Sequence, residues 1–184
     1  IDGISMKTRE LSDCCPMHQC FEHLAVLALQ PLLRAKLLPY QFASIPEKGQ
    51  VALKRQVERW LRRKSLGVRY GLKMDVKSAY QNTSHAVVMG ILEHEIPHAA
   101  WLLAVVRSLL AMAPHGGLLI GGYLEAWLFN LVASYLMRQL LSYAKARRSA
   151  SLPLVQRCCS YMDDLGLFGR RWADMQSAAR KITK

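Results

Sequence analysis

The chain has 184 residues, 52% of them hydrophobic, which is enough for one domain or a two-lobed domain with a substantial core. Lysine and arginine outnumber aspartate and glutamate by 25 to 13, and the net charge of +12 predicts an anionic partner, above all nucleic acid. Five cysteines in no disulfide-like spacing argue against a disulfide-bonded secreted domain and predict a reducing, cytoplasmic setting.

No signal peptide is recognised, and neither apolar stretch predicts a membrane span. Residues 99–113 are short and contain Arg107, and residues 118–141 are interrupted by Glu125 and other polar residues. The first residue is not Met, and the chain stops soon after its most informative motif, so we expect a fragment of a longer protein.

Pro16 predicts the first turn of a helix, because a missing N–H costs nothing there. Apolar residues then recur at helical spacing and predict one buried face: Met17, Cys20, Phe21, Leu24, Leu27 and Ala28. A zinc site is the alternative for Cys15, His18, Cys20 and His23. Their spacing matches no common zinc pattern, so packing is the favoured interpretation.

Residues 40–45 predict a strand, residues 46–49 a turn and residues 50–63 a helix. The residues expected to face inward are Leu53, Val57, Trp60 and Leu61. The other face of this helix is basic, through Lys54, Arg55, Arg59, Arg62 and Arg63. Such a face can simply be solvated, but Glu58 is its only acid, so contact with phosphates is the favoured interpretation.

Residues 69–76 alternate as in a half-buried strand, with Tyr70, Leu72 and Met74 on one face and Lys73 and Asp75 on the other. Asp75 therefore lies at the end of the strand. Helices are expected next, the first capped by Ser84 with an inner face of Val87, Val88, Ile91 and Leu92. Further helices are predicted over residues 99–113, from Gly121-Gly122 onward, and over 172–182, with a basic, serine-rich loop around Lys145.

Tyr161-Met162-Asp163-Asp164 lies between apolar, β-prone residues, and Gly169 closes the run, which predicts a strand, a tight turn and a second strand. Adjacent carboxylates repel each other unless a cation lies between them, and oxygen ligands of this kind suit magnesium. The alternative is a solvated hairpin tip in which the two acids only favour the turn.

The two acidic strands would bring Asp75 together with Asp163 and Asp164 if they are neighbours in an antiparallel sheet with helices on the other face. Three such carboxylates could hold two divalent ions about 3.5–4 Å apart. Phosphoryl transfer requires metals, positioning and positive charge rather than covalent catalysis by the protein. The sequence contains residues for all three.

These motifs, in this order, resemble a known family. Asp75-Val76-Lys77-Ser78-Ala79-Tyr80, residues 117–130 and Tyr161-Met162-Asp163-Asp164 resemble motifs A, B and C of reverse transcriptases. Residues 41–50 and 54–61 look like the fingers of the bacterial and phage branch that includes retron, group II intron and diversity-generating retroelement enzymes. The resemblance covers nearly the whole chain.

The resemblance implies an α+β fold with the fingers and palm of a right-hand polymerase. Residues 1–68 would be fingers-like, and residues 69–184 would form a palm with a small antiparallel sheet backed by helices. The two regions would make one reverse transcriptase domain, and the thumb would be absent. The implied activity is RNA-directed DNA synthesis in the cytoplasm of a bacterium, by a bacterial or phage-encoded enzyme.

The resemblance also implies roles for individual residues. Asp75 and Asp163 would be metal ligands, with Asp164 as the second acid of motif C and the Val76 carbonyl completing a metal shell. Two Mg²⁺ ions are implied, for which Mn²⁺ can substitute. The implied partners are an RNA template, a DNA primer and product, and deoxynucleoside triphosphates, and an accessory protein or structured RNA is a further candidate.

Tyr80 would select deoxynucleotides by contacting the sugar, although packing at a strand end is its alternative role. Lys48 and Arg55 are candidates for binding the triphosphate, and Gly121 lies in the stretch that would follow the nascent base pair. The residues implied to contact nucleic acid are Lys54, Arg59, Arg62, Arg63, Tyr161 and Met162.

Motif B departs from the family pattern, because Ser-Gln is replaced by Glu125-Ala126 and a proline by Leu119. The Ala126 side chain cannot hydrogen-bond to a template, and Glu125 is expected to place a negative charge near a polyanion.

Three alternatives to a reverse transcriptase stay open. The altered motif B favours a degenerate copy kept as a nucleic-acid-binding or phage-defence module. The other two are an RNA-templated RNA polymerase of the same shape and a basic structural protein.

Overall fold

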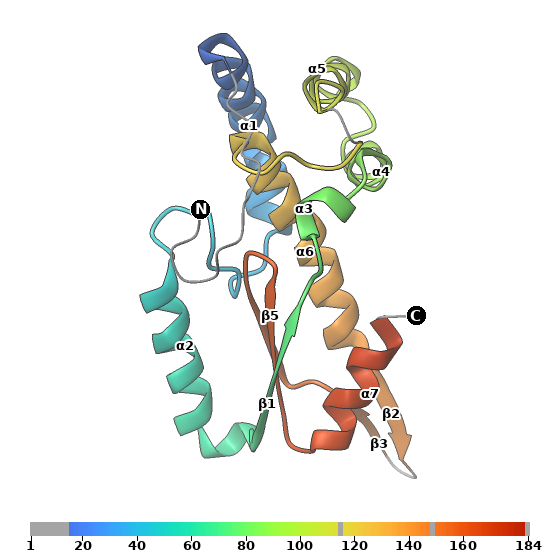
Figure 1. The fold of residues 1–184 in the computed structure, drawn as a ribbon. Helices are drawn as coiled ribbons and strands as arrows, with labels where there is room; N and C mark the ends of the chain where they lie inside the picture. The colour runs from blue at the N-terminus through green and yellow to red at the C-terminus, as the bar shows by residue number, and fades with distance from the viewer. Residues whose placement is uncertain (1–14, 114–115, 148–149, 183–184) are drawn as a thin grey trace. The chain divides into compact units, whose positions relative to one another are not determined.

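The computed structural model describes residues 15–113, 116–147 and 150–182 and shows an α+β protein with small antiparallel sheets (Figure 1). The start of the predicted fingers-like region, before residue 15, and residues 148–149 after Lys145 lie outside the described residues. The chain divides into two compact units, Ile1–Ala35 with Ser78–Phe129 and Lys36–Lys77 with Asn130–Lys184. The division into fingers and palm at residue 68 remains a prediction from the resemblance.

The first unit is helical. It contains nearly all of α1 (Pro16–Lys36), the short α3 (Ala79–Asn82), α4 (His85–Glu95), α5 (Ala100–Leu110) and the start of α6 (Tyr123–Ser142). The predicted cap of α4 is confirmed, because the Ser84 Oγ accepts a hydrogen bond from the Val87 N–H at 3.3 Å. Val88 and Leu92 are buried as expected, whereas Val87 is exposed.

The prediction for the buried face of α1 is wrong. Its apolar residues Met17, Phe21, Leu24 and Leu27 are about half to two-thirds exposed, and Cys20 and Ala28 are exposed as well. The buried face instead consists of His18, Glu22, Ala25, Val26, Leu29 and Leu33. Two apolar stripes share this helix, and the buried one contains the polar side chains of His18 and Glu22, whose Nε2 and Oε1 atoms lie 2.9 Å apart. Apolar spacing therefore selected the wrong stripe.

The second unit is built on a three-stranded antiparallel sheet with the order β1-β5-β4. Its strands are β1 (Tyr70–Asp75), β4 (Arg157–Tyr161) and β5 (Asp164–Gly169). The predicted strand, turn and strand around Asp163 is confirmed, and so is the expectation that β1 neighbours this hairpin, as Figure 1 shows for β1 and β5.

Helices cover both faces of this sheet within the second unit. Leu72, Met74, Leu165 and Leu167 face one core cluster, which includes Met137 and Leu140 of α6 and Ala178 of α7 (Trp172–Ile182). Cys159 and Phe168 face the other way, toward Trp60 of α2 (Gln50–Arg62). Because side chains alternate along a strand, the odd-numbered residues of β5 face α6 and α7, and its even-numbered residues face α2. Leu61, predicted to face inward on α2, is 55% exposed.

The predicted strand at residues 40–45 is wrong apart from a single bridge between Gln41 and Ser160. Gln41 is completely buried, and its side chain accepts from the Leu38 N–H and donates to the Asn130 carbonyl, both at 2.7 Å. Asn130 in turn donates to the Ala43 carbonyl at 3.0 Å. The segment therefore pairs with β4 only around Ser160, which accepts from the Phe42 N–H and donates to the Tyr40 carbonyl, both at 3.0 Å, and side-chain amides hold its flanks.

The loop predicted around Lys145 is also wrong, because β2 (Ala144–Arg147) and β3 (Ala150–Pro153) pair as an antiparallel ribbon. The Lys145 ammonium forms an ion pair with Asp174 of α7. In the three described stretches, no helix combines the length and apolar character that a membrane span requires.

Candidate functional site

The sheet register places the predicted acids of motifs A and C opposite each other. Asp75 at the end of β1 pairs with Asp164 at the start of β5, and Asp164 pairs with Tyr161 of β4. Directly opposed residues project from the same face, with Cβ atoms typically about 4.5–5.5 Å apart. Asp75, Asp164 and Tyr161 therefore form one row across the sheet. They lie on the same face as Cys159 and Phe168, which α2 covers.

The turn that carries Asp163 is tied to the end of β1. The Val76 N–H donates to the Asp163 carbonyl at 3.2 Å, which extends the β1–β5 pairing into the turn. Met162 has a φ of +52°, in the left-handed region that glycine usually occupies in a two-residue hairpin turn. Met162 and Asp163 are both exposed at the tip.

A lysine lies among the three acids. Lys73 projects from the same face as Asp75, two residues earlier on β1, and its Nζ lies 2.8 Å from Asp164 Oδ2. The hydrogen bond and attraction of Asp164 raise the pKa of Lys73, and attraction by Asp75 and Asp163 adds to the rise. One ammonium thus interacts electrostatically with all three carboxylates.

The donor chemistry of this site fits a hard divalent cation, because three carboxylates and the Val76 carbonyl are the oxygen ligands that Mg²⁺ prefers. The side chains are not arranged as a finished metal shell: in the described ranges, no group of three or more His, Cys, Asp or Glu side chains is placed to hold a metal ion. That observation applies to Asp75, Asp163 and Asp164, and also to the zinc site that was the alternative for four residues of α1 and its start, of which Cys15 and Cys20 are exposed.

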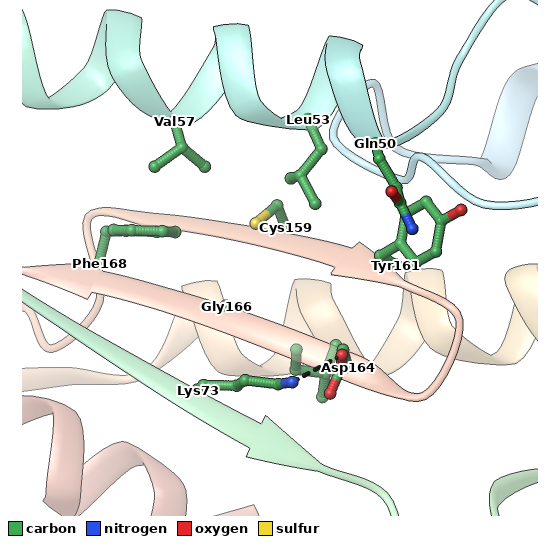
Figure 2. Close-up of a pocket in the computed structure, with 10 residues that line it drawn as sticks. Gln50, Leu53, Val57, Lys73, Cys159, Tyr161, Asp164, Gly166 and Phe168 are labelled. Carbon is green, nitrogen blue, oxygen red and sulfur yellow. Dashed lines mark ion pairs between the residues drawn. The ribbon is translucent and has the colours of Figure 1, made fainter. Parts of the chain in front are cut away.

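Asp75, Asp163 and Asp164 are called the acidic row below. A pocket of about 370 Å³ adjoins this row at Asp164 and opens between α2 and the sheet. Figure 2 shows Leu53 and Val57 of α2 above Cys159 and Phe168, with Lys73 directed at Asp164 at one end. Gly166 lies on β5 opposite Lys73, and an added Cβ there would come within 2.9 Å of the Cys159 sulfur. The pocket therefore has an apolar interior and a charged end.

The basic residues of α2 lie on its outer side. The side chains of Lys54, Arg55, Arg59, Arg62 and Arg63 are exposed. Leu53, Val57 and Trp60 pack inward. No ion pair links those five cations to an acid in the described part of the chain. Within the described residues, the basic face predicted to bind phosphate is therefore exposed and has no acidic partner.

Lys48 has partners within the chain. Its Nζ donates to the Pro39 carbonyl at 3.0 Å and lies 5.7 Å from the centre of the Phe42 ring. Partial burial lowers its pKa. Lys48 would have to leave these partners to bind a triphosphate, whereas Arg55 is exposed and has no ion-pair partner in the described ranges.

Tyr80 and Gly121 belong to the first unit. The Tyr80 ring stacks on Phe129 with centroids 4.8 Å apart, and its carbonyl accepts from the Leu118 N–H at 2.9 Å. This is the packing role that was the alternative for Tyr80. Gly121 has a φ of +107°, which side-chain-bearing residues rarely adopt, so its backbone conformation requires glycine.

Glu125 is not placed as expected. It is 1% exposed at the start of α6 rather than presented to a polyanion. Its neighbour Glu22 accepts from the Tyr123 N–H at 2.8 Å, so a side chain of α1 caps α6. His18 Nε2 lies 2.9 Å from the other oxygen of Glu22.

Burial raises the pKa of Glu125 to about 7, and repulsion by Glu22 adds to the rise, against a backbone hydrogen bond that lowers it. Its Oε2 has no hydrogen-bond partner within the described residues. The sequence offered no signal for this burial, because Glu125 lies in the first turn of α6, where acids are ordinarily exposed. The interaction of Lys73 with the acids, by contrast, could have been predicted from the sequence, because a residue two positions before Asp75 projects from the same face of the strand.

Neither the protein-family models nor the curated proteins with which the chain was compared match it.

Proposed function

We propose that this chain is the catalytic part of an RNA-directed DNA polymerase, which adds deoxynucleotides to a primer 3′-hydroxyl. The observation that carries the proposal is the register that sets Asp75 beside Asp164 across β1 and β5, with Asp163 in the adjoining turn. The sequence order of the three motifs supports a reverse transcriptase rather than another phosphoryl transferase.

Asp75, Asp163, Asp164 and the Val76 carbonyl would hold the two Mg²⁺ ions. When bound, such ions make the primer hydroxyl a better nucleophile and neutralise charge on the leaving pyrophosphate. The contribution of the protein is to hold the carboxylates at a fixed spacing on a rigid sheet. A sheet with a packed core behind it is well suited to this task.

The outer face of α2 would bind the nucleic-acid backbone, because its five cations are exposed and have no acidic partners among the residues that the structure describes. Arg55 would reach the incoming triphosphate, with Lys48 as a second candidate once it leaves Pro39. Tyr161 and Met162 adjoin the acids in the hairpin and would approach the primer end. Tyr80 and Gly121 would approach the nascent base pair, as the resemblance implies.

In this proposal the second unit supplies the palm sheet and the basic helix of the fingers. The small antiparallel sheet, backed by α6 and α7, supports that assignment.

Primer extension tests the proposal. The purified protein should extend a DNA primer on an RNA template with Mg²⁺ or Mn²⁺. Asp163→Asn should reduce extension below detection, because it removes a metal-binding charge from an exposed turn without disturbing the core. Glu93→Gln removes an exposed carboxylate of α4 and serves as the matched control.

Full extension by the Asp163→Asn variant would refute the metal assignment. A melting temperature for that variant close to the parent value would show that lost activity does not reflect lost folding.

A second candidate function is a nucleic-acid-binding or phage-defence module that has lost templated synthesis. Ala126 favours this second function, because its methyl group cannot form the hydrogen bond to a template that the glutamine of the family pattern would form. The buried Glu125 does not favour it, since its charge is not presented at the surface. Salt-sensitive RNA binding without extension, in both the parent and Asp163→Asn, would identify this second function.

A further inference from the structure

Lys73 has an unusual combination of exposure and partners. Its side chain is 72% exposed, yet its ammonium is held 2.8 Å from Asp164 and is also attracted by Asp75 and Asp163. A long, solvent-exposed lysine has considerable rotamer entropy to lose, and a single surface ion pair rarely compensates for it. Three acids acting on one ammonium provide the additional attraction.

The position of Lys73 follows from the register. Lys73 and Asp75 project from the same face of β1, and the residue opposite Lys73 on β5 is Gly166, which has no side chain. The lysine can therefore extend diagonally from β1 toward Asp164 on β5, and Figure 2 shows its ammonium directed at that carboxylate. A larger residue at position 166 would contact Cys159 and Phe168.

The same three carboxylates are the proposed metal ligands. An ammonium and a divalent cation compete for them, because both are attracted by the same charge and each repels the other. The competition centres on Asp164, whose Oδ2 is already engaged.

We propose that Lys73 is a built-in counter-cation that holds the acidic row together without metal and competes with the divalent ions for Asp164. This inference rests on the proposed function, since it assumes that the acids bind metal. The exposed lysine can swing off the sheet, and the anionic oxygens of an incoming triphosphate are an alternative partner for its ammonium. Metal occupancy would thereby become coupled to nucleotide binding.

The test is the affinity for Mn²⁺ in the absence of nucleotide and nucleic acid, followed by the electron paramagnetic resonance signal of the free ion. Lys73→Gln should bind Mn²⁺ on the order of tenfold more tightly than the parent at low ionic strength, because it removes one exposed positive charge from the site. Lys73→Arg keeps that charge and should bind like the parent.

Lys64→Gln is the matched control, because it removes the same charge from an exposed residue that precedes β1. It should change the affinity by less than about twofold, since exposed charges well apart are largely screened. Adding Asp75→Asn to Lys73→Gln should weaken binding again, which would show that the gain arises at the acidic row.

The two proposals fail differently. Equal Mn²⁺ affinity for the parent and Lys73→Gln, or weaker binding by the variant, would overturn the role of Lys73 while leaving the metal site intact. Absence of Mn²⁺ binding by both proteins would overturn the metal site itself, and this inference with it.

Discussion

At the scale of single residues, burial changes the chemistry of side chains whose types alone are uninformative. Glu125 and Asp164 are both carboxylates near the start of a secondary-structure element, yet one is 1% exposed and the other forms an exposed ion pair with Lys73. Asp164 could be predicted from its motif. Glu125 could not, because its environment is created by α1, about a hundred residues earlier in the chain.

The raised pKa of Glu125 predicts a pH-dependent stability. Its pKa is about 7 in the folded protein and near 4.5 when unfolded, so the folded state retains a proton that the unfolded state has lost. The contribution of protonated Glu125 to the free energy of unfolding is fully present below about pH 4.5 and is lost as pH rises through about 7. The free energy of unfolding falls by up to about 3 kcal/mol over this range.

Glu125→Gln should remove this dependence and should be more stable than the parent at pH 8. Urea unfolding at pH 5 and pH 8 would measure the difference. Glu47→Gln, which alters an exposed carboxylate, is the control. A parent and a Glu125→Gln variant with parallel stability profiles would contradict the assignment.

At the scale of elements, the sequence predicted those defined by local patterns. Alternation predicted β1, the turn residues predicted the β4–β5 hairpin, and the final helix begins and ends as expected. The strand predicted at residues 40–45 is only a single bridge to Ser160, and the buried amides of Gln41 and Asn130 tie this segment to Leu38 and α6 instead. Periodicity cannot reveal a partner 89 residues away.

Gln41→Leu should therefore destabilise the protein strongly. The substitution leaves the Leu38 N–H and the Asn130 carbonyl without their side-chain partner inside the core. The expected loss is about 2–4 kcal/mol in the free energy of unfolding, measured by chemical denaturation. Gln139→Leu changes an exposed glutamine of α6 and should stay within about 0.5 kcal/mol of the parent. Comparable losses in both variants would argue against the buried network.

At the scale of the whole molecule, net charge predicted an anionic partner but could not say which surface binds it. The structure narrows this question, because the outer face of α2 carries five exposed cations without acidic partners in the described part of the chain. Arg107, by contrast, is paired with Glu93.

Replacing Arg59 and Arg62 together with glutamine should weaken RNA binding and reduce the slope of log affinity against log salt by about 1–2. Fluorescence anisotropy at several salt concentrations would measure the slope. Arg34→Gln with Arg107→Gln removes the same charge from α1 and α5 and should leave the slope nearly unchanged. An equal effect of both pairs would indicate a general charge effect rather than a binding surface.

The pairing of Asp75 with Asp164 has an evolutionary consequence. Because side chains alternate along a strand, a shift of β1 by one residue would turn Asp75 away from Asp164 and would also move Leu72 and Met74 out of the core. An insertion or deletion within β1 is therefore penalised by instability whether or not the activity is needed. Point substitutions of the acids escape that penalty, so a lineage released from selection for catalysis would keep the strand alignment and lose only the carboxylates.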